Sequence, residues 1–401
     1  ASPAGLDLVT VTVTPGVPAQ LAFADQPTDT EVNATINPAA PHMTVEVQDQ
    51  CGNVVTTATN LVALAINTNP GGGALAGTTV KAAVAGIATF DNLSINQVGA
   101  NYDLLAVSGA LTPAVSATFN VTPGAKAALR FVQAPTSAAA DAFIAPAVTV
   151  EIVDAFGNRT ADVDAITLTI DNNPGGGTLT GGGPTAAVAG LATFNALNID
   201  KVGTGYTLRA TAAGLTDAVS GTFNITPGTA TQLAFLQPPT NVAANATITP
   251  AVTVEIRDAN DNRVTTATDN VTIAIGTNPS GGALSGTLTQ AAIAGVATFN
   301  DLAIDTAGIG YTLDVTAAGL AGDTSVAFNV TAGAATKLVF GTQPGNATAD
   351  GVIPGFTVQV LDAADNLVTT ASNAVTIAIG TNPGGGTLSG TVTQSAVNGI
   401  A

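Results

Sequence analysis

The chain has 401 residues, of which 46% are apolar and only 9% are charged. Low hydrophobicity is what keeps a chain unfolded, so this composition excludes an intrinsically disordered protein. Nine Lys and Arg against 27 Asp and Glu give a net charge of -18, which repels nucleic acid and acidic membranes. No apolar run is as long as the ~18 residues of a spanning helix, so we expect no direct membrane insertion.

A Gly-rich turn divides the chain into repeats. The sequence Asn-Pro-Gly-Gly-Gly, with one Ser variant, begins at Asn69, Asn173, Asn278 and Asn382, at intervals of 104 or 105 residues. A fixed period of this kind indicates one module copied along the chain. Thr-Pro-Gly steps at 14–16, 122–124 and 226–228, with Thr-Ala-Gly at 331–333, predict short, stiff joints between modules.

These joints predict the domain boundaries. We expect three complete modules at 17–123, 124–227 and 228–332, and an incomplete fourth module at 333–401. Residues 1–16 match the end of module 3, so we expect them to be the last strand of a preceding module. The sequence is thus expected to be part of a longer polypeptide that carries further copies of the same module.

Within each module, short apolar runs alternate with turn residues. In the third copy they lie at 233–237, 247–249, 252–257, 271–275, 284–291, 295–304, 311–315 and 326–330. Val252, Val254 and Ile256 are predicted to face the core, with Glu255 and Arg257 in water. Seven or more short strands per repeat predict an all-β fold: tandem Ig-like β-sandwiches of about 105 residues each, in a linear array.

The three tyrosines of the chain occupy one position of the repeat. Tyr102, Tyr206 and Tyr311 each follow a Gly-containing turn and open the penultimate strand. A tyrosine at this place is typical of a tyrosine corner, in which the ring packs at the end of the sandwich and the hydroxyl bonds nearby backbone. We interpret the three as structural residues.

Three ordered motifs carry a resemblance to a known family. They are Val153-Asp154-Ala155-Phe156-Gly157-Asn158, then Gly190-Leu191-Ala192-Thr193-Phe194, and then Gly203-Thr204-Gly205-Tyr206-Thr207-Leu208. Together they resemble the bacterial immunoglobulin-like repeats of invasin/intimin-type surface proteins. The resemblance implies an Ig-like sandwich and a place in a long, rod-like protein of the bacterial exterior. No outer-membrane barrel, lectin-like tip or anchoring signal accompanies the motifs, so receptor recognition is not carried over.

Two Asp-rich turns are the candidate ion sites. They span 258–262 and 362–366, and Asp258, Asn260, Asp261, Asp362 and Asp365 supply side-chain oxygens of the kind that bind Ca²⁺. The first turn resembles the calcium-linker motif of cadherins, but that motif lies at a domain junction, whereas this turn lies between two strands of one module. We therefore favour turn capping, in which these side chains bond their own backbone.

The residue inventory argues against catalysis. His42 is the only histidine, so neither a Ser-His-Asp arrangement nor a His-based metal site can be assembled. Glu46, Glu151 and Glu255 share one repeated strand position, which indicates a solvated strand face rather than paired catalytic carboxylates. We expect no enzyme and no cofactor apart from the Ca²⁺ considered above.

Asn-x-Ser/Thr triplets recur just before the joints. Asn120, Asn224 and Asn329 are equivalent, and in an exported protein they are candidate acceptors for N-glycosylation. A Thr- and Asn-rich β chain also produces such triplets by composition alone.

The sequence thus predicts an extracellular structural stalk or filament-forming repeat of a bacterial surface, acting as a non-enzymatic spacer. Its expected partners are further copies of the module, and its surface ligand is unknown. Two alternatives remain open: a multivalent adhesin or glycan- or host-protein-binding array, and the repeat region of a larger secreted enzyme.

Overall fold

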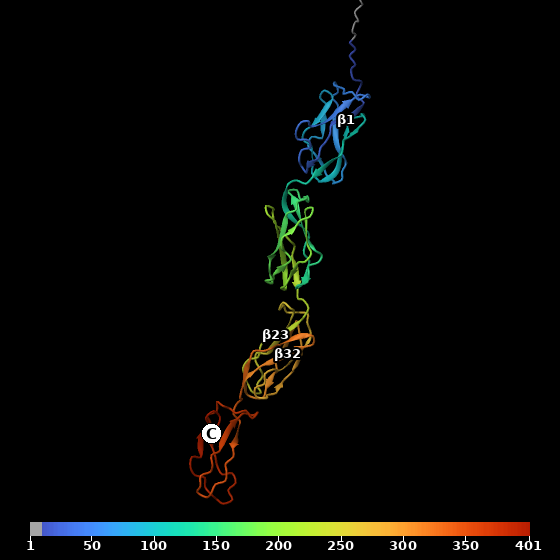
Figure 1. Cartoon of the computed structure of the whole chain (residues 1–401). Coiled ribbons are helices and arrows are strands. Elements are labelled where there is room, and N and C mark those ends of the chain that lie inside the picture. Colours follow the sequence, from blue (N-terminus) through green and yellow to red (C-terminus); the bar gives the residue numbers. More distant parts are fainter. Residues whose placement is uncertain (1–9) are drawn as a thin grey trace, which may run out of the picture.

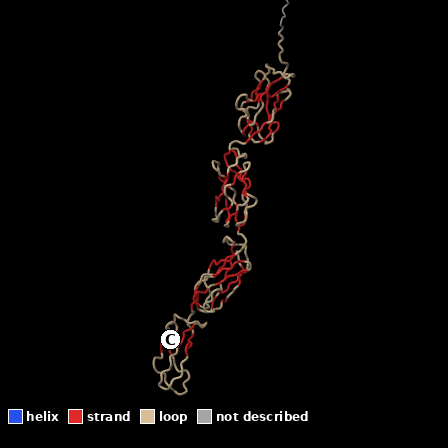
Figure 2. The backbone as a smooth tube through the Cα atoms, in the orientation of Figure 1, coloured by secondary structure: helices blue, strands red, loops and turns tan. Residues whose placement is uncertain are grey.

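Four β-bodies follow one another along the chain in a computed structural model that describes residues 10–401 (Figure 1). We call them modules 1 to 4 in chain order. Each has its own core cluster of buried apolar residues. Figure 2 shows strands and loops only, and no helix occurs in the described part. The all-β expectation and the linear array are confirmed.

The strands are short, and most are paired antiparallel. Module 1 contains β1 (Gln20–Asp25), β2 (Thr30–Glu31), β3 (Met43–Gln48), β4 (Leu61–Thr68), β5 (Leu75–Ala76), β6 (Val80–Ala82), β7 (Ile87–Phe90), β8 (Ser94–Ile95), β9 (Gly99–Val107), β10 (Ala114–Val115) and β11 (Phe119–Thr122). Module 2 contains β12 (Lys126–Gln133), β13 (Ala138–Ala139), β14 (Val148–Asp154), β15 (Ala165–Asn172), β16 (Leu179–Thr180), β17 (Thr185–Ala186), β18 (Leu191–Phe194), β19 (Asn198–Ile199), β20 (Gly203–Thr211), β21 (Ala218–Val219) and β22 (Phe223–Thr226).

Module 3 repeats this order, and module 4 stops part-way through it. Module 3 contains β23 (Gln232–Gln237), β24 (Val242–Ala243), β25 (Val252–Arg257), β26 (Asn270–Ile275), β27 (Leu284–Ser285), β28 (Thr289–Ala291), β29 (Val296–Phe299), β30 (Ala303–Ile304), β31 (Gly308–Tyr311), β32 (Leu313–Ala317), β33 (Leu320–Thr324) and β34 (Phe328–Thr331). Module 4 contains β35 (Lys337–Thr342), β36 (Thr357–Leu361), β37 (Ala374–Thr376) and β38 (Thr393–Ser395).

Two main sheets make modules 1 and 2 sandwiches, and in module 3 the strand β33 links strands of both layers into one seven-stranded order, β28-β26-β32-β33-β23-β25-β29. In module 1 one sheet has the order β1-β3-β7 and the other the order β2-β11-β9-β4-β6, and module 2 repeats both orders. In each module the second sheet includes a short parallel pair between an early strand and the last one: β2 with β11, β13 with β22, and β24 with β34. The Ig-like sandwich follows from this pairing.

The alternation of apolar and polar residues along the strands predicts the buried apolar residues correctly, but it is wrong for Glu151 and Glu255. Val252, Val254 and Ile256 are fully buried, as their period-two spacing predicts. Glu255 is also buried, and its equivalent Glu151 is only 3% exposed, so the expectation of a solvated glutamate face is wrong at these two positions.

Arginines on neighbouring segments explain the burial of Glu151, whereas Glu255 pairs with Arg257 of its own strand. Arg130 Nε donates to Glu151 Oε1 at 2.6 Å, and Arg159 Nε donates to Glu151 Oε2 at 2.8 Å. The aliphatic stems of such arginines cover the carboxylate while their charged ends pair with it. Periodicity alone cannot show this, because the partners come from other segments of the chain.

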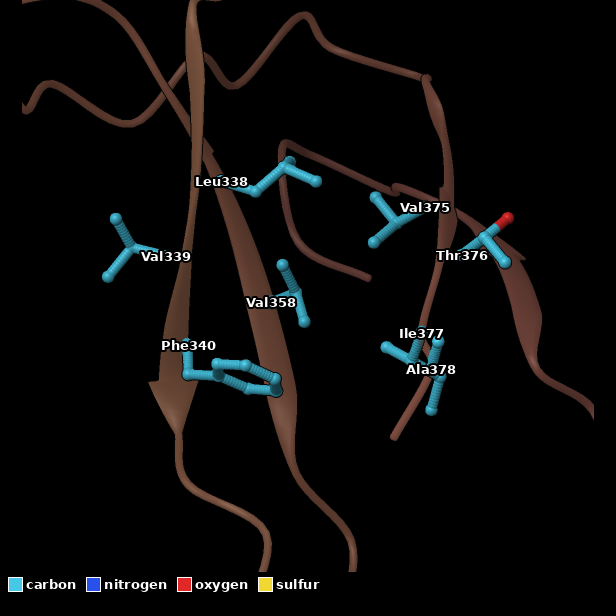
Figure 3. A pocket seen from close by; sticks show the side chains of 8 residues that line it. All are labelled: Leu338, Val339, Phe340, Val358, Val375, Thr376, Ile377 and Ala378. Carbon is cyan, nitrogen blue, oxygen red and sulfur yellow. The ribbon is translucent and has the colours of Figure 1, made fainter. Parts of the chain in front are cut away.

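Module 4 has an open core. Leu338 is 54% exposed, whereas its equivalent Leu233 in module 3 is 4% exposed. An apolar cleft with a volume of about 220 Å³ lies between β35 and β37. Figure 3 shows side chains that line it, among them Phe340 and Ile377. In module 3 the strands β31 to β34 pack over the corresponding residues. The cleft is therefore the inside of a sandwich rather than a formed ligand site.

The predicted last strand at 1–16 falls partly on residues 1–9, which lie outside the described residues. From Thr10 to Gly16 no strand is formed, and Val11 is 76% exposed.

Candidate functional site

Each tyrosine occupies the same place at the end of its module. Tyr102, Tyr206 and Tyr311 are fully buried. Their hydroxyls donate to the backbone oxygen five residues upstream, at Gln97, Lys201 and Thr306, over 3.0, 2.8 and 2.9 Å. Each ring also packs against a phenylalanine of the last strand, with ring centroids 6.0 to 6.2 Å apart. This geometry supports a structural role, since the hydroxyl fixes the loop before its own strand.

The Gly-rich turn closes over this hydroxyl. In module 2 the Asn173 side chain brackets the turn, donating to Gly177 O and accepting from Gly177 N, each at 2.8 Å. A Cβ added at Gly175 would lie 2.2 Å from Val202 O and 2.4 Å from the Tyr206 hydroxyl. The turn therefore packs directly on the tyrosine loop in module 2, although module 3 has Ser280 at the position of Gly175. Burial raises the pKa of Tyr206.

A buried aspartate holds the joint that enters each module. Gly228 N donates to Asp258 Oδ2 at 2.8 Å, and the joint glycines Gly16, Gly124 and Gly333 donate in the same way to Asp49, Asp154 and Asp362. Each bond joins the linker to the Asp-rich turn of the following module. Since all four joints repeat it, the bond is a property of the module itself.

Hydrogen bonds keep these carboxylates charged. The bond from Gly16 is the main cause that lowers the pKa of Asp49 to about 2. Burial raises the pKa of Asp154, Asp258 and Asp362, but hydrogen bonds from the turn asparagine and the joint glycine outweigh it. Their pKa values therefore lie below the ordinary range.

The Ca²⁺ candidates are engaged with donors. Asp258 Oδ1 accepts hydrogen bonds from the backbone of Asn260 and Asn262 at 2.9 Å, which is an Asx-type turn cap. Asp261 Oδ1 accepts a bond from Gln232 Nε2 at 2.9 Å. N–H groups aimed at the oxygens leave little room for a cation, so the arrangement favours capping. Among residues 10–401, no cluster of three His, Cys, Asp or Glu side chains is placed to hold a metal.

The Asp-rich turn of module 4, residues 362–366, has the same capping hydrogen bonds as the turn at 258–262. Asp362 Oδ1 accepts from Ala364 N and Asn366 N at 2.8 and 2.9 Å, and Asp365 pairs with Lys337. Asp261 and Asp365 have φ of 60° and 66°, in the left-handed region that Gly52 and Gly157 occupy in the earlier copies. Aspartate tolerates this conformation, which explains the drift from Gly to Asp.

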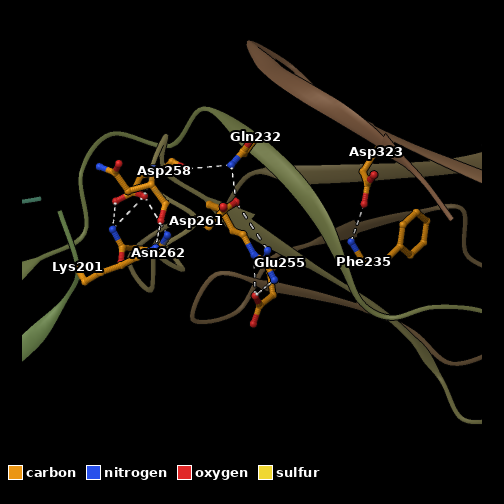
Figure 4. A network of polar contacts seen from close by, with 10 residues as sticks. Lys201, Gln232, Phe235, Glu255, Asp258, Asp261, Asn262 and Asp323 are labelled. Atoms are coloured by element: carbon orange, nitrogen blue, oxygen red, sulfur yellow. Dashed lines mark hydrogen bonds and ion pairs between the residues drawn. The ribbon is translucent and has the colours of Figure 1, made fainter. Parts of the chain in front are cut away.

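The position of the 258–262 turn differs from our expectation. We placed it within one module and away from a junction, but in space it lies against the preceding module (Figure 4). Asn262 Nδ2 donates to Asp200 O at 2.8 Å, and the Lys201 ammonium donates to Asn260 O. Sequence order could not show this, because the contact joins residues about sixty positions apart.

Sequence reasoning also missed Asn262 and its equivalent Asn366 as contact residues. Both are buried, and both make hydrogen bonds across a joint. The signal was present, because an asparagine ends the Asp-rich turn in all four copies, at Asn53, Asn158, Asn262 and Asn366. Only the position of the neighbouring module gives that signal a meaning.

Comparisons with known proteins give structural neighbours only. No protein-family model and no curated protein matches the chain. The Escherichia coli adhesin FdeC matches at 16% identity and a TM-score of 0.38, over 80% of this chain and 100% of that one. Invasin, a bacterial integrin-binding protein, matches at 13% identity and a TM-score of 0.29, over 85% and 66% of the two chains.

The surface layer protein SbsC, domains 1–6, matches at 15% identity and a TM-score of 0.26, over 91% of this chain and 48% of that one. By their names, these neighbours are a bacterial adhesin, a bacterial integrin-binding protein and a surface layer protein. At these identities the likeness concerns the fold.

The candidate glycosylation residues take part in the strand pairing. The side-chain oxygens of Asn120, Asn224 and Asn329 accept hydrogen bonds from the backbone N–H of Asn101, Gly205 and Gly310, at 3.0, 2.9 and 3.0 Å. Each bond sits where the register shifts between the last strand and the tyrosine strand. The three asparagines therefore support a β-bulge, and glycosylation stays a prediction.

The arrangement at the module ends binds and orients backbone through asparagine, aspartate and tyrosine side chains. The His42 ring hydrogen-bonds the backbone oxygen of Asn37 through Nδ1, at 3.2 Å. No helix among residues 10–401 is long and apolar enough to cross a membrane.

Proposed function

We propose that this protein is an extracellular structural stalk or filament-forming repeat of a bacterial surface, and that it acts as a non-enzymatic spacer. The observation that carries the proposal is the repeated joint. Each linker glycine is bonded to a buried aspartate of the module that it enters, so every linker is anchored to its following module in the same way.

Two further features support the spacer role. The four cores are separate, so each module holds its own structure and adds its own length. The net charge of -18 disfavours lateral association between copies. Further copies of the module, along a longer chain or fibre, are the proposed partners.

Small-angle X-ray scattering tests the proposal. Four sandwiches of roughly 35–40 Å each give a rod of about 150 Å, which has a radius of gyration of about 45 Å. A compact globular chain of this size would have a radius of gyration of about 21 Å. We expect the larger value, independent of protein concentration, and a value near the smaller one would refute the spacer.

A linker variant provides the control. Inserting a flexible Gly-Ser segment between Pro227 and Gly228 is expected to lower the radius of gyration, because the joint then loses its fixed direction. Micromolar binding of a glycan or host protein to the unmodified chain would instead favour the adhesive array.

A further inference from the structure

We infer that the asparagine ending each Asp-rich turn is a latch that binds the tyrosine loop of the preceding module, and that this latch is closed at two of the three joints. The inference rests on the proposed spacer role, and it goes further by saying which joints of the rod are stiff and which joint bends. The asparagine binds backbone groups of the preceding module, so the contact does not depend on the side chains of that loop.

The joint between modules 2 and 3 shows the closed latch. Asn262 Nδ2 donates to Asp200 O at 2.8 Å, and Val202 N donates to Asn262 Oδ1 at 3.1 Å. One side-chain amide thus pairs with a carbonyl and an N–H group two residues apart. The carbonyl between them, of Lys201, accepts the Tyr206 hydroxyl at 2.8 Å. The tyrosine therefore holds the strip of backbone that the next module binds.

The joint between modules 3 and 4 repeats this geometry with other side chains. Asn366 Nδ2 donates to Asp305 O at 2.9 Å, and Ala307 N donates to Asn366 Oδ1 at 2.8 Å. Between them, Thr306 O accepts the Tyr311 hydroxyl at 2.9 Å. Two of the three loop residues differ between the joints, yet the bonds are the same, because both partners of the asparagine are backbone groups.

The joint between modules 1 and 2 is open. Among the described residues, Asn158 Nδ2 donates only to Asp154, at 3.3 and 3.1 Å, and the loop at 96–98 makes no hydrogen bond to Asn158. Asn158 is half-buried, whereas Asn262 and Asn366 are each 8% exposed. The loop residue Gln97 is correspondingly exposed, while its equivalent Lys201 is half-buried.

One of the two closed joints has a further side-chain bond. At the joint between modules 2 and 3, Asn260 donates a hydrogen bond across the joint to Asp141. Its equivalents are Phe156 in module 2, which is 60% exposed, and Ala364 in module 4, and neither side chain has a polar group that could make this bond. The first joint thus lacks both side-chain bonds, and we expect the rod to bend there while modules 2 to 4 move as one stiff segment.

Hydrogen exchange of three equivalent amides in the full chain tests the inference. Val202 N and Ala307 N are bonded to the latch, and Val98 N is their unlatched counterpart in module 1. We expect Val202 and Ala307 to exchange about five- to tenfold more slowly than Val98, after correction for intrinsic rates, because a hydrogen bond of this kind is worth about 1 kcal/mol or somewhat more. Equal protection of all three amides would overturn the inference without any variant.

A matched pair of substitutions isolates the contact across the joint. Asn262→Ala and Asn158→Ala both remove hydrogen bonds to the aspartate of their own turn, but only the first removes bonds to another module. We expect Asn262→Ala to speed exchange at Val202 by about tenfold and Asn158→Ala to leave Val98 and Val202 unchanged. Equal effects of both variants at the loop of the preceding module would also overturn the latch.

Distances between spin labels distinguish a failure of the latch inference from a failure of the spacer proposal. In a Cys51→Ser background, labels on modules 2 and 3 should give a narrow distribution that broadens in Asn262→Ala, and labels on modules 1 and 2 a broad one that stays as it is. If the two joints give distance distributions of equal width while scattering still shows a rod, the latch inference is wrong and the spacer proposal stands. A compact chain would remove the spacer proposal itself.

Discussion

The tyrosine hydroxyl of module 3 gives the sharpest test of how a module end is held together. In Tyr311→Phe the ring and its packing on Phe328 are kept, but Thr306 O loses its only described side-chain donor. The hydroxyl is buried, and a Cβ added at Gly282 would lie 2.7 Å from it, so the Gly-rich turn leaves little space for a replacing water.

The expected cost follows from that environment. A buried acceptor left without its partner costs about 1 to 3 kcal/mol, and we expect about 1.5 kcal/mol here because the ring still fills its site. For a module of this size that lowers the melting temperature by about 8 °C.

Module-resolved hydrogen exchange is the appropriate assay, because a four-module chain does not unfold in a single two-state step. Amides of β32 should exchange about tenfold faster in Tyr311→Phe, and modules 1 and 2 of the same molecule serve as internal controls. Unchanged exchange in β32, or acceleration of all modules together, would refute the reasoning.

Three further predictions concern backbone and charge. Gly177→Ala should destabilise module 2 by about 2 kcal/mol through overpacking against Ile199 and the Tyr206 hydroxyl, as its thermal melt will show, whereas Gly386→Ala, whose nearest neighbouring atom lies at 4.0 Å, should be neutral. Ala294→Asn should stabilise module 3 by about 0.5 to 1 kcal/mol in denaturant titration, because Ala294 has φ of 49° and module 4 already has Asn398 there. The joint carboxylates have lowered pKa values in the folded state, so their contribution to stability is present above the ordinary aspartate pKa of about 4 and is lost as the pH falls through the folded-state pKa, which is about 2 for Asp49 and lies below the ordinary range for Asp258. Thermal melts at decreasing pH should show this loss, and Asp258→Asn should make it smaller.

The sequence was most informative where structure is local and periodic. The fourfold Gly-rich turn, the alternation at Val252, Val254 and Ile256, and the place of the tyrosines all depend on residues close in the chain, and the structure agrees with each of them. Period-two alternation reports which face of a strand a residue occupies.

The alternation does not show which side chains from other segments cover the outer face of a strand, and our prediction that the glutamates there are solvated was wrong for this reason. Glu151 faces outward by its position but is covered by two arginines from other segments. The latch residue Asn262 was likewise beyond reach, because its partner strip at 200–202 belongs to another module. Its meaning depends on the direction in which the linker leaves, which the sequence of one module does not contain.

The short parallel pair in each sandwich has a consequence for a molecule under tension. In module 1, Val121 and Thr122 next to the exit are paired in parallel with Thr30 and Glu31 near the entrance. When the two ends are pulled apart, these neighbouring strand segments are drawn past each other, and their hydrogen bonds are loaded together rather than opened one by one. Each complete module should therefore resist stretching until the pair ruptures as a unit, so that a pulled chain lengthens in abrupt steps.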